Sequence, residues 1–380
     1  MLNKEDGEGF NTQRRQHLLS VSKFAVGLTA WHTSDAWAAQ PKRQPNPNPN
    51  PSVAALKPEK RNVIIATSQP AALPYLPLLV AQHHGFFAQQ GIELQISEQQ
   101  SAARSIAAVG AGQADMVCGW LENMLSAPGR ALALQSFVLL GAAPMMAFGV
   151  PTRPPGSKLA VTTELAELRG RSIGVVSLNS PTHTVALAAL RHAGLRAGDV
   201  RFVSVGSPAS ATAALRSGQI DALVQLDPLM LELEQRGELL MLADMRNPSA
   251  AYAVLGMHLP SSCVAAPQEF LQRYPGTAQA CSDALVQALQ WLARASLRDV
   301  LRLQDVLAGY VQSLDAQSFV ASFERMRTAY CADGMCSQQM AANLLSAMHE
   351  AEPTLRLEKI DAARSVTNAF VQRSKLRLKA

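Results

Sequence analysis

Short apolar runs alternate with longer amphipathic stretches through the middle of the chain. Val63–Ala66 is a continuous apolar run, and the stretch from Leu76 to Phe87 behind it has helical periodicity. The same order recurs at Ser172–Val176 and Thr182–Ala193. Further strands are predicted at Ile92–Ile96, Asp115–Cys118, Phe202–Val205, Ala222–Val224 and Tyr252–His258, and further helices at Ser101–Ala111, Ala209–Arg216 and Thr277–Ala295. This alternation predicts an α/β fold built from two parallel-sheet units.

Proline-rich stretches divide the chain. Pro45–Pro51 alternates proline with asparagine and suits neither helix nor sheet, so it predicts an extended tether. Pro151–Ser157 holds three prolines and a glycine and marks a crossover between the two repeats. The expected organisation is an export signal at 1–38, a linker at 39–61, the first part of lobe 1 at 62–152, lobe 2 at 153–251, and a lobe 1 return strand with C-terminal helices at 252–380.

The first forty residues have the features of a targeting sequence. Arg14-Arg15 precede a modest apolar stretch, Leu18–Trp31, and Ala36-Trp37-Ala38 has the small-x-small form of a signal-peptidase site. We therefore expect cleavage after Ala38 and a periplasmic protein. Paired arginines are typical of twin-arginine export, but Gln16-His17-Leu18 departs from the usual pattern, so the general secretory route stays open.

The net charge of +5 is concentrated before the predicted folded part. Residues 39–61 hold five basic side chains and one acidic one, whereas residues 1–38 are balanced, which leaves +1 for the remainder. A part so nearly neutral lacks the electrostatic footprint of a nucleic-acid binder. Hydrophobic residues at 48% and charged residues at 17% also exclude a mainly disordered protein.

Five scattered cysteines do not form a disulfide framework. Cys331 and Cys336 flank an Asp-Gly turn that can bring them together, and a small disulfide or two free thiols are both compatible with this spacing. Cys118, Cys263 and Cys281 lie in apolar settings and are expected in the core. The CxxxxC spacing has no partner His or Cys nearby, so we expect no metal site and no cofactor.

An ordered series of short motifs runs through residues 62–270: Pro74–Ala81, Gly85-Phe86-Phe87, Gly91–Leu94, Gly112–Asp115, Leu168–Val175, Gly218–Ala222 and Asp227-Pro228. This series resembles the nitrate/sulfonate/taurine group of periplasmic solute-binding proteins, which includes binders of thiamine-pyrimidine precursors. The resemblance implies a type II periplasmic-binding-protein fold, with two βα lobes around a ligand cleft. It also implies a small-molecule ligand that is delivered to an ABC permease in the inner membrane.

One stretch departs from that group. Cys118-Gly119-Trp120-Leu121-Glu122-Asn123 stands where the group has glycines and serines. A bulkier, acidic wall argues against an inorganic anion such as nitrate. We therefore expect a small organic anion, sulfonate-like or related.

Candidate ligand-binding residues follow the strand ends in both repeats. They are Ser68, Gln69, Tyr75, Gly119, Trp120 and Glu122 in the first repeat, and Asn179, Ser180, Thr182, His183 and Asp227 in the second. The resemblance places an anion-binding turn at Asn179–His183, where the N-terminus of a helix presents unpaired N–H groups. Each position also has a structural interpretation: turn chemistry, core packing for Tyr75 and Trp120, or a helix cap for Asp227. A loop arginine, Arg246, either clamps an anion or is simply exposed.

Three classes of function fit such a chain. A phosphate loop, a G-x-S-x-G elbow and an HExxH pair are all absent from the sequence, as is the cysteine cluster of the fungal pyrimidine-precursor synthase. We therefore expect a monomeric solute-binding protein that closes around its ligand, not an enzyme. The alternatives are an enzyme on the same fold that acts on a small pyrimidine or carboxylate, and a ligand-sensing module.

Overall fold

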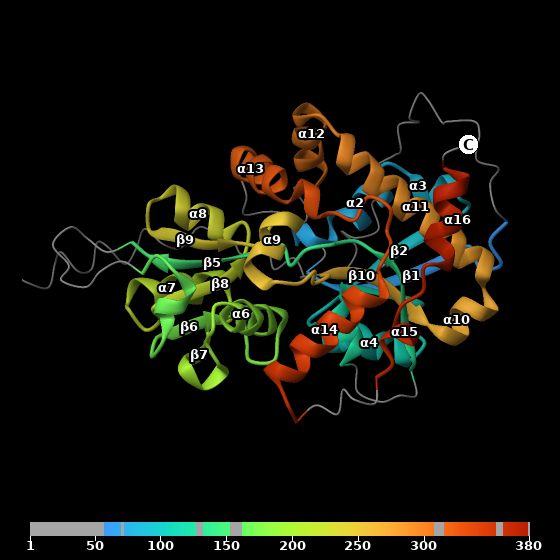
Figure 1. Ribbon diagram of the computed structural model, residues 1–380. Helices are drawn as coiled ribbons and strands as arrows, with labels where there is room; N and C mark the ends of the chain where they lie inside the picture. Colours follow the sequence, from blue (N-terminus) through green and yellow to red (C-terminus); the bar gives the residue numbers. More distant parts are fainter. Residues whose placement is uncertain are drawn as a thin grey trace, which may run out of the picture. The chain divides into compact units, whose positions relative to one another are not determined.

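A computed structural model describes residues 57–69, 72–126, 132–152, 162–307, 315–354 and 360–378, with backbone alone for residues 304–307. The predicted export signal at 1–38 and linker residues 39–56 lie outside the described residues. The described chain contains two five-stranded sheets with helices around each, which confirms the predicted α/β fold with two lobes (Figure 1). Among these residues, no helix combines the length and the apolar character needed to cross a bilayer.

The first sheet has the strand order β2-β1-β3-β10-β4. Its strands are β1 (Asn62–Ser68), β2 (Glu93–Gln99), β3 (Met116–Trp120), β4 (Leu134–Leu139) and β10 (Ser262–Pro267). β1 pairs in parallel with β2 and β3, whereas β10 runs antiparallel between β3 and β4. β10 is antiparallel because the returning chain enters beside the end of β3, where the Leu121 N–H donates to the Ser261 carbonyl at 2.8 Å. The sheet is therefore mixed, and β1, β2 and β3 form the predicted parallel unit.

The second sheet repeats this plan with the order β7-β6-β8-β5-β9. Its strands are β5 (Met146–Pro151), β6 (Ser172–Val175), β7 (Arg201–Ser204), β8 (Ala222–Leu226) and β9 (Leu239–Asp244). β6 lies between β7 and β8 in parallel, and β5 runs antiparallel to β8 and β9. Both sheets thus place the first strand of a repeat between its second and third strands, as the internal similarity of the sequence predicts.

Helices connect the strands in each lobe. In the first lobe they are η1 (Leu73–Tyr75), α2 (Leu76–His83), α3 (Phe86–Gln89), α4 (Ala102–Gly110) and α5 (Leu121–Leu125). In the second they are η2 (Leu165–Leu168), α6 (Pro181–His192), η3 (Ala197–Asp199), α7 (Pro208–Arg216) and α8 (Leu229–Gln235). The helix predicted from Leu76 to Phe87 is two helices, because Gly85 adopts φ +71° and ends the first.

The strand predicted at Tyr252–His258 is wrong, because this segment lies in helix α9 (Pro248–Leu255) and the turn after it. The Asn247 side chain accepts a hydrogen bond from the Ala250 N–H at 2.9 Å, Pro248 occupies the first turn, and Gly256 follows at φ +67°. These are ordinary helix start and stop signals. A short apolar run cannot by itself distinguish a buried helix from a strand. The strand that returns to the first sheet is β10.

The chain passes between the sheets twice, after β4 and after β9. The two segments are hydrogen-bonded to each other: the Met145 N–H donates to the Met245 carbonyl at 3.1 Å, and the Met245 N–H donates to the Met146 carbonyl at 3.0 Å. Gly141 in the first segment lies so close to the second that an added Cβ would be 2.0 Å from Ser261 Oγ. Only a glycine fits this approach.

The chain after β10 is helical, as predicted. It forms α10 (Gln268–Arg273), α11 (Pro275–Arg294), α12 (Leu297–Leu307), α13 (Ala316–Met326), η4 (Arg327–Ala329), α14 (Gln338–Ala351), α15 (Ala362–Ser365) and α16 (Ala369–Arg377). α11 packs against α2, α3 and α16, and most of its residues are buried. Glu59 closes its N-terminus, accepting hydrogen bonds from the backbone N–H groups of Gly276 at 3.0 Å and Thr277 at 2.8 Å.

Candidate ligand-binding site

One hydrogen bond joins Glu122, a predicted site residue of the first lobe, to a helix of the second lobe. Thr184 Oγ1 in α6 donates to Glu122 Oε1 in α5 at 3.0 Å. Both residues are buried, with Glu122 7% and Thr184 1% exposed. The sequence predicts Glu122 and Thr182 at this place but not Thr184, which faces inward one turn beyond Ser180. Only the helical spacing from Ser180 could have indicated Thr184.

Glu122 is an acid in a nearly dry environment. Burial raises the pKa of Glu122 to about 7, and the hydrogen bond from Thr184 opposes that shift. Near neutral pH the carboxyl therefore exists in both protonation states. A carboxyl group of this kind can accept hydrogen bonds when ionised and can donate one when protonated.

The other first-lobe candidates have different local environments. Trp120 is half-buried against the core, and Tyr75 is buried at the start of α2, where burial beside the thiols of Cys118 and Cys263 raises the pKa of its phenol. An added Cβ on Gly119 would be 2.7 Å from Met124 Cε, so this glycine allows α5 to pack closely. Ser68 and Gln69 end β1, and the Gln69 carbonyl accepts from the Ala72 N–H at 2.9 Å. Tyr75 and Gly119 thus lie in the packing of the first lobe.

The turn before α6 uses its own hydroxyl groups. Ser180 Oγ donates to the Ser177 carbonyl at 2.6 Å and lies 2.9 Å from Thr182 Oγ1. Since the Ser180 proton is already committed, Thr182 is the donor of the second bond; Thr182 Oγ1 also accepts from the Val176 N–H at 2.9 Å. Both hydroxyl protons predicted to face a ligand are therefore bonded within the turn.

His183 is also part of this turn. Its Nδ1 accepts from the Asn179 N–H at 3.2 Å, and its ring packs edge-on against Phe202 with centroids 4.5 Å apart. Burial lowers the pKa of His183, while the carboxylate of Glu352 acts in the opposite direction. The imidazole is therefore neutral near pH 7, which argues against the predicted role as a cation. Asn179 itself adopts φ +59°, a conformation that asparagine tolerates better than most residues.

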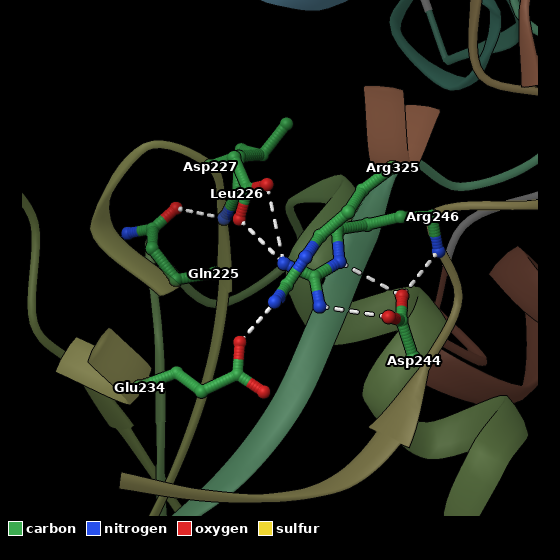
Figure 2. Close-up of polar contacts among 7 residues, drawn as sticks. All are labelled: Gln225, Leu226, Asp227, Glu234, Asp244, Arg246 and Arg325. Carbon is green, nitrogen blue, oxygen red and sulfur yellow. Dashed lines mark hydrogen bonds and ion pairs between the residues drawn. The ribbon is translucent and has the colours of Figure 1, made fainter. Parts of the chain in front are cut away.

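Asp227 is held by Arg246 and does not cap a helix (Figure 2). Arg246 Nη1 donates to both carboxylate oxygens of Asp227, at 2.9 and 3.1 Å, and Nε and Nη2 donate to Asp244 at 2.8 and 2.7 Å. The Arg246 side chain is 1% exposed and that of Asp227 is fully buried. The exposed alternative for Arg246 is wrong, because its side chain is buried and its guanidinium donates to two carboxylates of the protein. Its role as an anion clamp stays a prediction.

Neither a metal centre nor a disulfide is seen in the part of the chain that the structure describes. It holds no group of three or more His, Cys, Asp or Glu side chains arranged to bind a metal ion. Cys331 and Cys336 are free thiols, as are the three predicted core cysteines.

A hollow of about 500 Å³ lies farther along α6, between Leu187, Arg191, Leu195, Arg196 and Glu350, and none of the predicted site residues lines it.

Comparisons with known proteins agree with this architecture. The chain is 30% identical over 166 residues to a 4-amino-5-hydroxymethyl-2-methylpyrimidine phosphate synthase of Uromyces fabae, covering 43% of this chain and 46% of that protein. The chain thus spans about half the length of this curated relative. A solved structure from Bordetella bronchiseptica RB50 is 32% identical, with TM-score 0.68, over 85% of this chain and all of the other.

The alkanesulfonate-binding protein SsuA from Xanthomonas axonopodis pv. citri, bound to MOPS, has the same fold. It is 19% identical, with TM-score 0.61, over 81% of this chain and 99% of the other. The fold is therefore the predicted periplasmic-binding-protein fold. The sequence profile of the family described as NMT1/THI5 like matches residues 74–295, more than half of the chain. This match establishes that the chain belongs to the NMT1/THI5-like family.

Proposed function

We propose that this chain is the periplasmic solute-binding component of an ABC-type importer. The observation that carries the proposal is the Glu122–Thr184 hydrogen bond, which connects the ends of the two repeats at the site the sequence predicts. Contacts of this kind, made by both lobes, are what a ligand strengthens when it favours a closed state over an open one. The fold shared with a sulfonate-binding protein supports the same function.

The ligand class that these residues favour is a small organic anion that also carries a hydrogen-bond donor, such as an amine. Thr184 supplies one hydrogen bond to Glu122 Oε1, and a donor on the ligand would add a second to the ionised, buried carboxylate. The N-terminus of α6, in the second lobe, can bind a sulfonate or carboxylate through its backbone N–H groups and its helix dipole. An inorganic anion such as nitrate lacks the donor.

We also propose a periplasmic location and a membrane permease as the partner. The basic and apolar pattern at residues 1–38 supports export to the periplasm, with cleavage after Ala38. A permease in the inner membrane would then receive the ligand from the closed protein.

The proposal is tested by thermal unfolding of the purified chain with matched solutes. Taurine and ethanesulfonate differ by one amine, and nitrate and a thiamine-precursor pyrimidine complete the set. A solute at one hundred times its dissociation constant should stabilise the fold by about 2.7 kcal/mol, a shift of several degrees. We expect taurine to exceed ethanesulfonate and nitrate to have no effect. The absence of any shift would contradict the proposed ligand class.

A second candidate, an enzyme acting on a small pyrimidine, is favoured by the similarity to the Uromyces fabae synthase. The same samples distinguish the two functions. A captured solute is recovered unchanged by mass spectrometry, whereas turnover of a pyrimidine would favour the enzyme.

A further inference from the structure

Helix α13 is anchored to the first lobe by the chain that follows it. Arg327 Nη1 donates to the carbonyls of Leu292 and Ala295 at the end of α11, at 3.1 and 2.7 Å. The Tyr330 hydroxyl donates to the Leu73 carbonyl of η1 at 2.9 Å. Since α11 packs against α2 and α3, these bonds attach the C-terminal end of α13 to the helices of the first lobe.

From this anchored position α13 reaches the second lobe. Arg325 Nη1, in the last turn of α13, donates to Glu234 Oε2 of α8, and the two helices pack against each other (Figure 2). About a third of each side chain is exposed, 36% for Arg325 and 31% for Glu234. The two residues therefore form an ion pair between the lobes that solvent can reach.

A second ion pair of the same kind lies at α14. The chain before α14 is bonded to the first sheet, because the Leu139 N–H of β4 donates to the Gly334 carbonyl at 2.8 Å. α14 then packs against α5 of the first lobe and α6 of the second. Near its C-terminal end, Glu350 forms an ion pair with Arg191 of α6. Helices α13 and α14 thus each connect the first lobe to a different helix of the second.

We propose that the two interlobe ion pairs act as an ionic clasp, with which the C-terminal helices hold the second lobe in place beside the first. The clasp consists of Arg325–Glu234 and Arg191–Glu350. The inference rests on the proposed function and adds to it positioning residues outside the ligand site. A ligand that contacts both lobes binds more tightly when more of the molecules already have the lobes in this arrangement. Salt weakens the clasp, because both pairs are exposed enough to be screened.

The first test measures the distance between the lobes in the full chain without a ligand. Spin labels at Ala103→Cys in α4 and Ala209→Cys in α7 report this distance by pulsed electron paramagnetic resonance, since both alanines are exposed and the native thiols are buried. We expect Glu234→Arg to shift the distances to longer values, because two arginines then face each other, and more so when Glu350→Gln removes the second pair. Adding Arg325→Glu to Glu234→Arg reverses both charges of the pair and should restore the wild-type distances.

The matched control for these distances is Glu238→Arg. The Arg216–Glu238 pair is similarly exposed but lies within the second lobe, so its loss should leave the distances unchanged. Wild-type distances in Glu234→Arg, or a charge-reversed pair that fails to restore them, would overturn the clasp.

The second test connects the clasp to binding by isothermal titration calorimetry with taurine. Glu234→Gln and Glu350→Gln should each raise the dissociation constant about two- to fivefold, the range for exposed ion pairs, whereas Glu238→Gln should leave it unchanged. Added salt should weaken binding to the wild-type protein more than to the double variant Glu234→Gln/Glu350→Gln. Equal affinities in all of these proteins would overturn the effect of the clasp on binding. If taurine binds none of them, the proposed ligand class fails, and the interlobe distances alone decide whether the clasp exists.

Discussion

Arg246 and Asp227 form a buried ion pair between the segment after β9 and the end of β8, with Nη1 2.9 and 3.1 Å from the two carboxylate oxygens (Figure 2). Arg246 also holds Asp244, and it follows Met245, whose backbone is hydrogen-bonded to the other crossover. The pair therefore fixes the start of the segment that leads the chain back to the first sheet.

Replacing Arg246 should lower the free energy of unfolding. Arg246→Ala leaves Asp227 as an uncompensated buried carboxylate, which costs about 3–5 kcal/mol of unfolding free energy. The measurement is urea unfolding followed by circular dichroism. Arg216→Ala is the control, because the Arg216–Glu238 pair is exposed and exposed ion pairs contribute little to stability. Equal losses in the two variants would contradict the structural role of the buried pair.

Glu122 should make stability depend on pH. The folded-state pKa of Glu122, about 7, exceeds its ordinary value of 4.5, so the folded state binds the proton more tightly than the unfolded state. This contribution to stability is complete below pH 4.5 and is lost as the pH rises through 7. Relative to Glu122→Gln, the wild-type protein should lose about 3 kcal/mol between pH 4.5 and pH 8. The measurement is the free energy of unfolding of both proteins in the same series of buffers. If the two proteins depend on pH in the same way, the pKa of Glu122 is not raised.

Glu59 should stabilise the fold by capping helix α11. Its carboxylate caps the first turn of α11, so Glu59→Ala should cost about 1 kcal/mol and lower the melting temperature by a few degrees. The matched control is Glu269→Ala, an exposed acid in the first turn of α10. A melting temperature of Glu59→Ala that is no lower than that of Glu269→Ala would contradict the cap.

The five thiols should be free but unreactive in the folded protein. Burial raises the pKa of Cys331 and of Cys336 to about 12, and the other three thiols are shifted in the same direction. Since the thiolate is the reacting form, iodoacetamide should label the native protein slowly and all five positions after denaturation. Mass spectrometry counts the labels. Three labels after denaturation would show a disulfide, as the spacing of Cys331 and Cys336 also permits.

Local patterns in the sequence were sufficient for most of the fold. Apolar runs predicted β1, β3, β6 and β8, because a strand that is buried on both faces of a sheet has a nearly continuous run of hydrophobic residues. Prolines and glycines predicted where helices begin and end. Periodicity failed at Tyr252–His258 because the run is too short to separate the two periods, although the Asn247 cap and Gly256 were visible there. The lobe boundaries at 152 and 251 and the roles of the site residues stay predictions.

The sequence by itself determined the repeated α/β plan and the family, because each follows from residues close together in the chain, and it predicted Glu122 as the acid of the site. Only the tertiary structure decided which distant groups meet. It paired Thr184 with Glu122 across 62 positions and enclosed Asp227 and Arg246 together. A single side chain carries no mark of a distant partner, since hydrogen bonds and ion pairs depend on the spacing that the packed sheets and helices impose.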